Sequence, residues 1–203
     1  SVTKLRKTCV LSFATVICLI SCSKSDVVQE EPQPYTLAVP SNFPAFEDDP
    51  HNPLTQQGIS LGRKLFYDVR LSGNNKISCA SCHRQELSFS DGTALTDIGV
   101  SGTPLLRHAP ALINLAWANN GLFWDGGSTN LESQAFGPLS AHDEMSQDLY
   151  ELVGKLSADH QYVRLFQAAF EREVSASGVV KALAQFQLTM VPGNSPYDKY
   201  CRN

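Results

Sequence analysis

Ile77-Ser78-Cys79-Ala80-Ser81-Cys82-His83 is the stretch of this 203-residue chain that decides how the rest must fold. Two cysteines three residues apart, followed directly by a histidine, form the Cys-x-x-Cys-His pattern that attaches a c-type haem. On a short helix such residues share a face, so both sulfurs can bond to one edge of a porphyrin while the histidine ligates the iron. The sequence therefore predicts one haem c, held covalently by Cys79 and Cys82 with His83 as iron ligand.

Two other chemistries use a cysteine pair at this spacing. A thioredoxin-like redox pair lies at a junction between a strand and a helix, and a zinc site needs two further ligands close by. The residues around Cys79 and Cys82 show neither feature, so the pattern favours haem.

The reactivity of such a haem depends on the sixth position of its iron. A second strong ligand favours electron transfer, whereas an open face lets peroxide bind. Counting alone cannot choose among the candidate sixth ligands, which are His51, His108, His142, His160, Met145 and Met190.

The distribution of apolar residues predicts helices rather than strands. Asn52-Pro53 is expected to begin a helix with one apolar stripe. The last third predicts three more helices, capped by Ser146, Asp159 and Ser177. Glycine, proline and asparagine break the pattern over residues 86–127, and an irregular stretch of that length is expected only where a functional or cofactor-bound loop explains it. The predicted fold class is mainly α, a c-type cytochrome domain with long irregular loops around one haem.

The N-terminus has the layout of an export signal. Three basic side chains precede an apolar run over residues 9–20, which is too short to span a bilayer comfortably. The residues leading to Cys22 resemble the lipobox of bacterial lipoproteins. We therefore expect a lipoprotein-type signal peptide over 1–21, a lipid on Cys22, a flexible tether over 22–48 and a haem domain over 49–203. An ordinary signal peptide and an uncleaved anchor stay open, and all three alternatives put the domain outside the cytoplasm, in the periplasm.

The charge of the exported part excludes some partners. Removal of residues 1–21 would take away three basic and no acidic side chains, so the formal net charge would change from −4 to −7. An acidic protein without a basic stripe is not expected to bind nucleic acid, and a lipid chain would have to supply any attachment to a membrane. The six cysteines do not suggest a disulfide framework, and Cys201 has no assigned role.

Ten stretches, in order along the chain, carry a resemblance to a known family. They are residues 61–68, 71–72, 77–83, 89–92, 107–112, 123–127, 131–135, 137–139, 143–145 and 194–198. Together they resemble the N-terminal haem domain of the bacterial di-haem cytochrome c peroxidases, a family that includes the methylamine-utilisation di-haem enzymes. The resemblance implies an enzyme module that reduces hydrogen peroxide to water. It also implies electrons from a small donor protein, such as a cytochrome, passed through a second haem in a domain expected beyond residue 203.

The resemblance assigns roles to three further residues. The family's distal acid–base glutamate falls on Glu144, its distal glutamine on Gln134, and the tryptophan of its electron path on Trp124. A carboxylate beside the iron can take a proton from one oxygen of peroxide and deliver one to the other, and an amide can stabilise developing charge. Without the resemblance, Glu144 and Gln134 would be interpreted as surface residues and Trp124 as an aromatic packed under a loop.

The chain departs from the family in the loop over residues 97–102, which contains no histidine. Well-known members close the peroxide-binding haem with a histidine in this loop. We expect an open distal face instead, and the alternative is that His108 swings in as sixth ligand. The resemblance leaves calcium and a homodimer open. Two other functions also stay open: an electron-transfer cytochrome, and a di-haem oxidase that acts on a protein or amine substrate.

Overall fold

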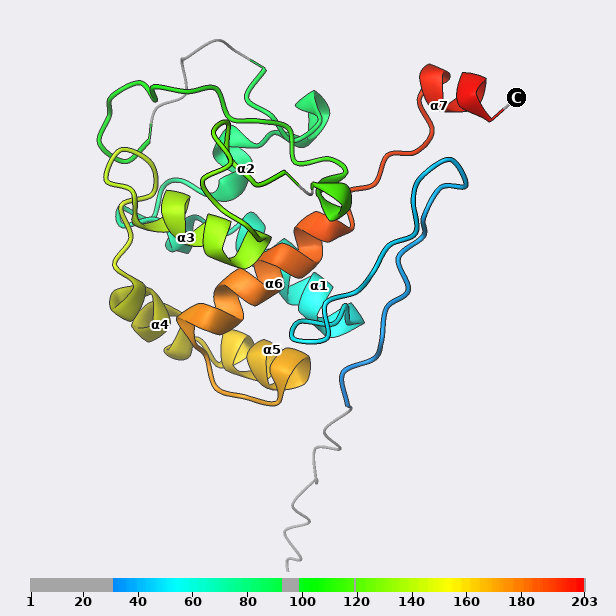
Figure 1. Ribbon diagram of the computed structural model, residues 1–203. Helices are drawn as coiled ribbons and strands as arrows, with labels where there is room; N and C mark the ends of the chain where they lie inside the picture. The colour runs from blue at the N-terminus through cyan, green and yellow to red at the C-terminus, as the bar shows by residue number, and fades with distance from the viewer. Residues whose placement is uncertain (1–30, 93–98, 119, 203) are drawn as a thin grey trace, which may run out of the picture.

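The computed structural model describes residues 31–92, 99–118 and 120–202, and within them the chain is helical (Figure 1). The α-helices are α1 (Gln56–Phe66), α2 (Cys79–Cys82), α3 (Leu131–Ser140), α4 (Leu149–Ser157), α5 (His160–Phe170), α6 (Ala176–Leu188) and α7 (Pro196–Cys201). Short 3-10 helices cover Val69–Leu71, Gln85–Leu87 and Leu115–Trp117. Over these ranges β structure is limited to isolated bridges, which confirms the mainly α class.

The predicted signal peptide and Cys22 lie outside the described residues. Across the three described ranges, no helix combines the length and apolar character needed to cross a membrane.

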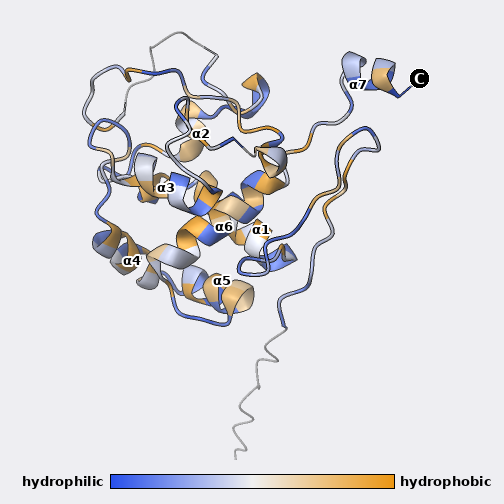
Figure 2. Ribbon diagram, viewed as in Figure 1, coloured by the Kyte–Doolittle hydropathy of each residue, from blue (hydrophilic) through white to orange (hydrophobic). Residues whose placement is uncertain are grey.

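The centre of the fold is the crossing of α1 and α6, with α3 packed on α6 and α5 on α1 (Figure 1). Helix α1 buries Leu61, Leu65 and Phe66 on one face, as its apolar stripe predicted. Gly62 lies on the same face, where a Cβ atom would stand 1.8 Å from the carbonyl oxygen of Ala182 in α6. Because a Cβ atom there would clash, the two backbones can approach closely only if position 62 has no side chain. Figure 2 shows the apolar residues of these helices.

The start of α1 differs from the prediction. The helix begins at Gln56, and Thr55 caps it by accepting a hydrogen bond from the backbone N–H of Gly58 at 3.0 Å. Asn52 is buried instead, where its amide donates to Glu132 at 2.6 Å and accepts from Gln185 at 2.9 Å. Asn52 thus ties the entrance of α1 to α3 and α6, a long-range role that its local sequence does not reveal.

Two of the three predicted C-terminal caps are also displaced. Asp159 caps α5 as predicted. Helix α4 is capped by Asp148 rather than Ser146, which has a left-handed φ of 46°. Helix α6 is capped by Ser175, and Ser177 lies inside the helix. In both cases a neighbouring polar residue supplies the oxygen that accepts from the first turn.

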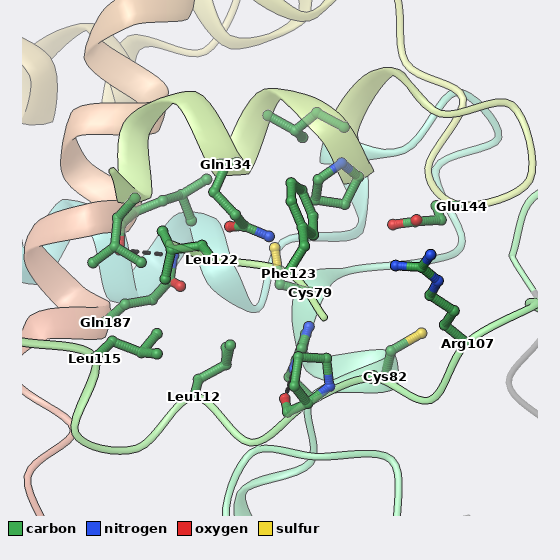
Figure 3. A pocket seen from close by; sticks show the side chains of 18 of the residues that line it. Cys79, Cys82, Arg107, Leu112, Leu115, Leu122, Phe123, Gln134, Glu144 and Gln187 are labelled. Atoms are coloured by element: carbon green, nitrogen blue, oxygen red, sulfur yellow. Dashed lines mark hydrogen bonds between the residues drawn. The ribbon is translucent and has the colours of Figure 1, made fainter. Parts of the chain in front are cut away.

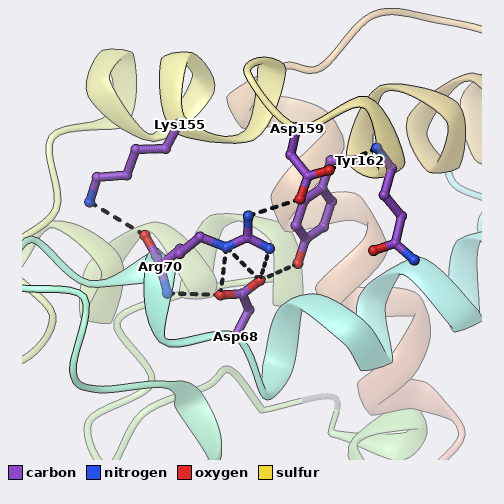
Figure 4. Close-up of polar contacts among 6 residues, drawn as sticks. Asp68, Arg70, Lys155, Asp159 and Tyr162 are labelled. Carbon is purple, nitrogen blue, oxygen red and sulfur yellow. Dashed lines mark hydrogen bonds and ion pairs between the residues drawn. The ribbon is translucent and has the colours of Figure 1, made fainter.

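A polar cluster joins the end of α1 to α5 (Figure 4). The buried Tyr162 donates its hydroxyl hydrogen to Asp68 at 2.6 Å, and the guanidinium of Arg70 donates to Asp68 at 2.7 Å and to Asp159 at 2.9 Å. Burial would raise the pKa of Asp68, but the hydrogen bonds from Arg70 and Tyr162 outweigh it and hold that pKa below its ordinary 3.8. Burial and the same carboxylate raise the pKa of Tyr162. The cluster therefore holds an ionised carboxylate against the core.

The segment before α1 packs on the helices. The backbone N–H of Tyr35 donates to the carbonyl of Leu54 at 2.9 Å. The ring of Phe43 meets that of Trp117 edge to face, with centroids 4.9 Å apart. Contacts with the helical body thus begin upstream of Asp49, within the range for which the composition predicted a solvated tether.

Candidate functional site

A cavity of about 630 Å³ brings the predicted site residues together (Figure 3). Helix α2 and the residue after it contribute Cys79, Cys82 and His83 to the lining. Other parts of the chain contribute Gln134, Glu144 and Trp124. Most of the remaining wall is apolar and includes Phe66, Leu112, Leu115, Leu122, Leu139 and Leu183. Its volume and lining are typical of a small-molecule or cofactor site, which is mostly apolar with a few polar groups.

Helix α2 presents the two cysteines as thiols. Both are partly buried and neither forms a disulfide. Burial raises the pKa of Cys79 to about 12. Redox-active cysteine pairs have lowered pKa values instead, so the protonated Cys79 does not fit a thioredoxin-like pair. The described part of the chain contains no group of three or more His, Cys, Asp or Glu side chains that could hold a metal ion.

His83 is held by two backbone carbonyls. Its Nδ1 atom donates to the carbonyl oxygen of Phe89 at 2.8 Å and to that of Pro110 at 3.1 Å. A proton fixed on Nδ1 leaves the lone pair on Nε2, and histidine ligands of metals are commonly oriented in this way. Phe89 has a left-handed φ of 58°, which costs a bulky residue about 1–2 kcal/mol. The backbone is therefore strained at a residue whose carbonyl orients His83.

Helix α3 faces the cavity along one stripe. Five of its residues have the three- and four-residue spacing of one helix face. All five line the cavity: Leu131, Gln134, Ala135, Pro138 and Leu139. Figure 3 shows the Gln134 amide pointing from α3 into the cavity. Glu144 follows in the turn after α3, and the figure shows its carboxylate on the same side as Cys82 and Arg107.

The turn that carries Glu144 is clamped from two sides by glycines. A Cβ atom on Gly99 would lie 1.8 Å from the carbonyl oxygen of Asp143, and one on Gly73 would lie 2.3 Å from that of Ser146. The backbone N–H of Val100 donates to the Glu144 carbonyl at 2.7 Å. Burial raises the pKa of Glu144 above its ordinary 4.5, and the negative charge of Asp143 adds to the rise. Burial and the neighbouring charge thus favour the protonated form of this carboxyl group more than in a solvent-exposed glutamate.

The segment over residues 107–110 also borders the cavity. Of the candidate sixth ligands of the iron, His108 and Met145 line the cavity. Met145 belongs to the apolar core, and the ring of His108 contacts the carboxylate of Asp91 through Nδ1. Trp124 is 62% exposed, and its indole N–H donates to the His108 carbonyl at 2.9 Å.

The sequence interpretation missed three residues of this region. Arg107 and Asp125 form an ion pair of 2.8 Å at the cavity wall. Asp91 is buried and contacts His108, which also lines the cavity. Each lies in a stretch that carried the family resemblance, but nothing in the sequence pairs them. Of the loop without histidine, residues 97 and 98 lie outside the described ranges, and Gly99 packs on the turn of Glu144.

The side chains fit a haem c. The cavity contains two cysteines that can bond to the porphyrin and one histidine, with a fixed tautomer, that can ligate the iron. Its large apolar wall can contact the porphyrin faces.

The chain is similar to several known proteins. A model of the family described as di-haem cytochrome c peroxidase matches residues 56–203. The methylamine utilization protein MauG of Methylorubrum extorquens is 37% identical over 94% of this chain and 56% of its own length. The cytochrome c peroxidase Ccp of Escherichia coli is 34% identical over 78% of this chain and 35% of its own.

Among solved structures, the crystal structure of a MauG-like protein associated with microbial copper homeostasis has a TM-score of 0.77 and 34% identity. The match covers 83% of this chain and 50% of that one. The chain thus spans from about a third to just over half of the length of these three proteins.

Proposed function

Because the chain belongs to the di-haem cytochrome c peroxidase family, we propose that it is a haem peroxidase module that reduces hydrogen peroxide to water. The observation that carries this proposal is the meeting of Gln134 and Glu144 with Cys79, Cys82 and His83 in one cavity. The family implies haem c as cofactor. In this proposal one haem is bonded to Cys79 and Cys82, and His83 is its iron ligand.

The proposed chemistry divides between the haem and the chain. The bound haem supplies the iron at which peroxide is reduced. Hydrogen peroxide takes up two electrons and two protons and leaves as two waters. Glu144 takes the proton from the near oxygen and returns it to the departing oxygen, a task for which a raised pKa is suited. The Gln134 amide holds the peroxide and stabilises charge as it develops. His83, oriented by two backbone carbonyls, would hold the iron.

The electrons are proposed to come from a small donor protein through a second haem, with Trp124 on their path. Trp124 suits this role because it lines the cavity and is largely exposed. The proposal also includes export to the periplasm and a lipid on Cys22, which rest on the N-terminal sequence.

Glu144→Gln tests the proposal in the haem-loaded full chain. Loss of general acid–base catalysis should slow peroxide-dependent oxidation of a small dye donor by about 10²–10⁴-fold. Glu151→Gln makes the same change on the exposed face of α4 and should leave the rate unaltered. A ferric haem that is fully low-spin and ignores peroxide would overturn the peroxidase proposal. A rate indifferent to Glu144→Gln would point to an electron-transfer cytochrome.

A second candidate function is oxidation of a protein or amine substrate by a di-haem enzyme. It is favoured by the 37% identity with a methylamine utilization protein. This function needs the same cavity, but it predicts slow turnover with small dye donors despite a fast reaction of the haem with peroxide. Single-turnover mixing with peroxide, compared with steady-state turnover, separates the two.

A further inference from the structure

Asp91 is a buried carboxylate to which neither the haem attachment nor the proton chemistry gives a role. It is 1% exposed. One of its oxygens accepts a hydrogen bond from the backbone N–H of Ala109 at 2.9 Å, and the other contacts Nδ1 of His108. A buried carboxyl group is costly unless its oxygens have polar partners, and these two contacts supply a partner to each oxygen of Asp91.

The segment that Asp91 holds supplies acceptors to the haem site. The carbonyl of Pro110, next to Ala109, accepts from His83 Nδ1 at 3.1 Å. The second carbonyl on His83 belongs to Phe89, two residues before Asp91. Asp91 therefore joins the two separate segments whose carbonyls converge on one imidazole nitrogen.

The same segment also reaches Trp124. The carbonyl of His108 accepts the indole N–H of Trp124 at 2.9 Å, and the rings of His108 and Trp124 lie with centroids 6.3 Å apart. One carboxylate thus contacts the segment that supplies acceptors to both His83 and Trp124.

We propose that Asp91 is a positioning residue that sets the hydrogen bonding of His83 and thereby the reduction potential of the haem. This inference rests on the proposed haem site. Acceptors on the second nitrogen of a histidine ligand increase its basicity, and a more basic ligand stabilises ferric over ferrous iron. If the segment at 108–110 loosens, the bonds to His83 weaken and the haem becomes easier to reduce.

Asp91→Ala in the haem-loaded full chain tests this by spectroelectrochemical titration. The midpoint potential should move to a more positive value by about 59 mV, which is a tenfold change in a one-electron equilibrium. The iron–histidine stretching frequency of the ferrous protein should fall, because it reports the strength of hydrogen bonding at Nδ1. Asp91→Asn keeps an oxygen for the Ala109 N–H, so its shift should be smaller.

Asp49→Ala is the matched control. Asp49 also accepts one backbone N–H, from His51 at 2.8 Å, but it is exposed and does not line the cavity. Wild-type potentials in both Asp91 variants, or an equal shift in Asp49→Ala, would overturn the role of Asp91 and leave the haem site standing. Wild-type protein with no haem on Cys79 and Cys82 by mass spectrometry would instead overturn the proposed function. If Asp91→Ala attaches no haem, the test rests on Asp91→Asn alone. A midpoint potential of Asp91→Asn equal to that of the wild type then refutes the proposal.

Discussion

Gly62→Ala tests the crossing that forms the centre of the fold. An added Cβ would lie 1.8 Å from the carbonyl oxygen of Ala182 and 2.9 Å from the Cβ atom of Phe186. Neither atom is the end of a flexible side chain, so α1 and α6 must part by more than an ångström to reach ordinary contact. Overpacking of this kind costs about 1–3 kcal/mol, and we take the upper end because backbone must move.

Alanine also has an advantage that must be subtracted. In a helix interior it is better than glycine by about 0.8–1 kcal/mol. The expected net loss for Gly62→Ala is therefore about 2 kcal/mol in the free energy of unfolding, or a fall in Tm of about 4–8 °C for a chain of this size. Since Phe66 of α1 and Leu183 of α6 both line the cavity, the same displacement should distort the haem site.

Gly154→Ala is the matched variant. Gly154 lies inside α4, where an added Cβ meets nothing within 4 Å, so the helix propensity gain should appear alone as a rise in stability of about 0.8–1 kcal/mol. Both variants are compared by urea and thermal unfolding of the full chain. If Gly62→Ala is as stable as wild type, or if both variants lose stability equally, the argument from the close crossing is refuted.

Three other changes probe the polar cluster and the turn of Glu144. Tyr162→Phe removes the donor to Asp68, and urea unfolding should report a loss of about 1.5–3 kcal/mol, as for a hydrogen bond to a charged group; no loss would mean that the bond contributes nothing. Because the pKa of Glu144 is raised above 4.5 and its ionised form accepts the first proton, peroxide turnover should fall as the pH drops through that raised pKa. A pH profile that keeps this acid limb in Glu144→Gln would contradict the assignment. Gly99→Ala drives a Cβ into the Asp143 carbonyl, and displacement of the turn should slow the peroxide reaction by on the order of 10²-fold; an unchanged single-turnover rate would show that the clamp is unimportant.

The sequence predicted the parts of the fold that are encoded in short windows. The apolar stripe of α1 and the helices of the last third follow a period of 3.6 residues, so their existence and buried faces could be read directly. Their ends were less certain. Asp148 caps α4 in place of Ser146, and Ser175 caps α6 in place of Ser177. Several polar residues lie near the start of each helix, and only one of them can reach the first turn.

The haem motif divides in the same way. The spacing of Cys79, Cys82 and His83 is local to one helical turn, and by itself it determined the predicted cofactor and its attachment points. The support of His83 by the carbonyls of Phe89 and Pro110 was decided only by tertiary structure. The same is true of the single cavity that Gln134 and Glu144 share. The contacts of His83 depend on described residues within 86–127, where no periodic pattern constrains the chain, and the buried Asp91 links two segments there by accepting from the Ala109 N–H.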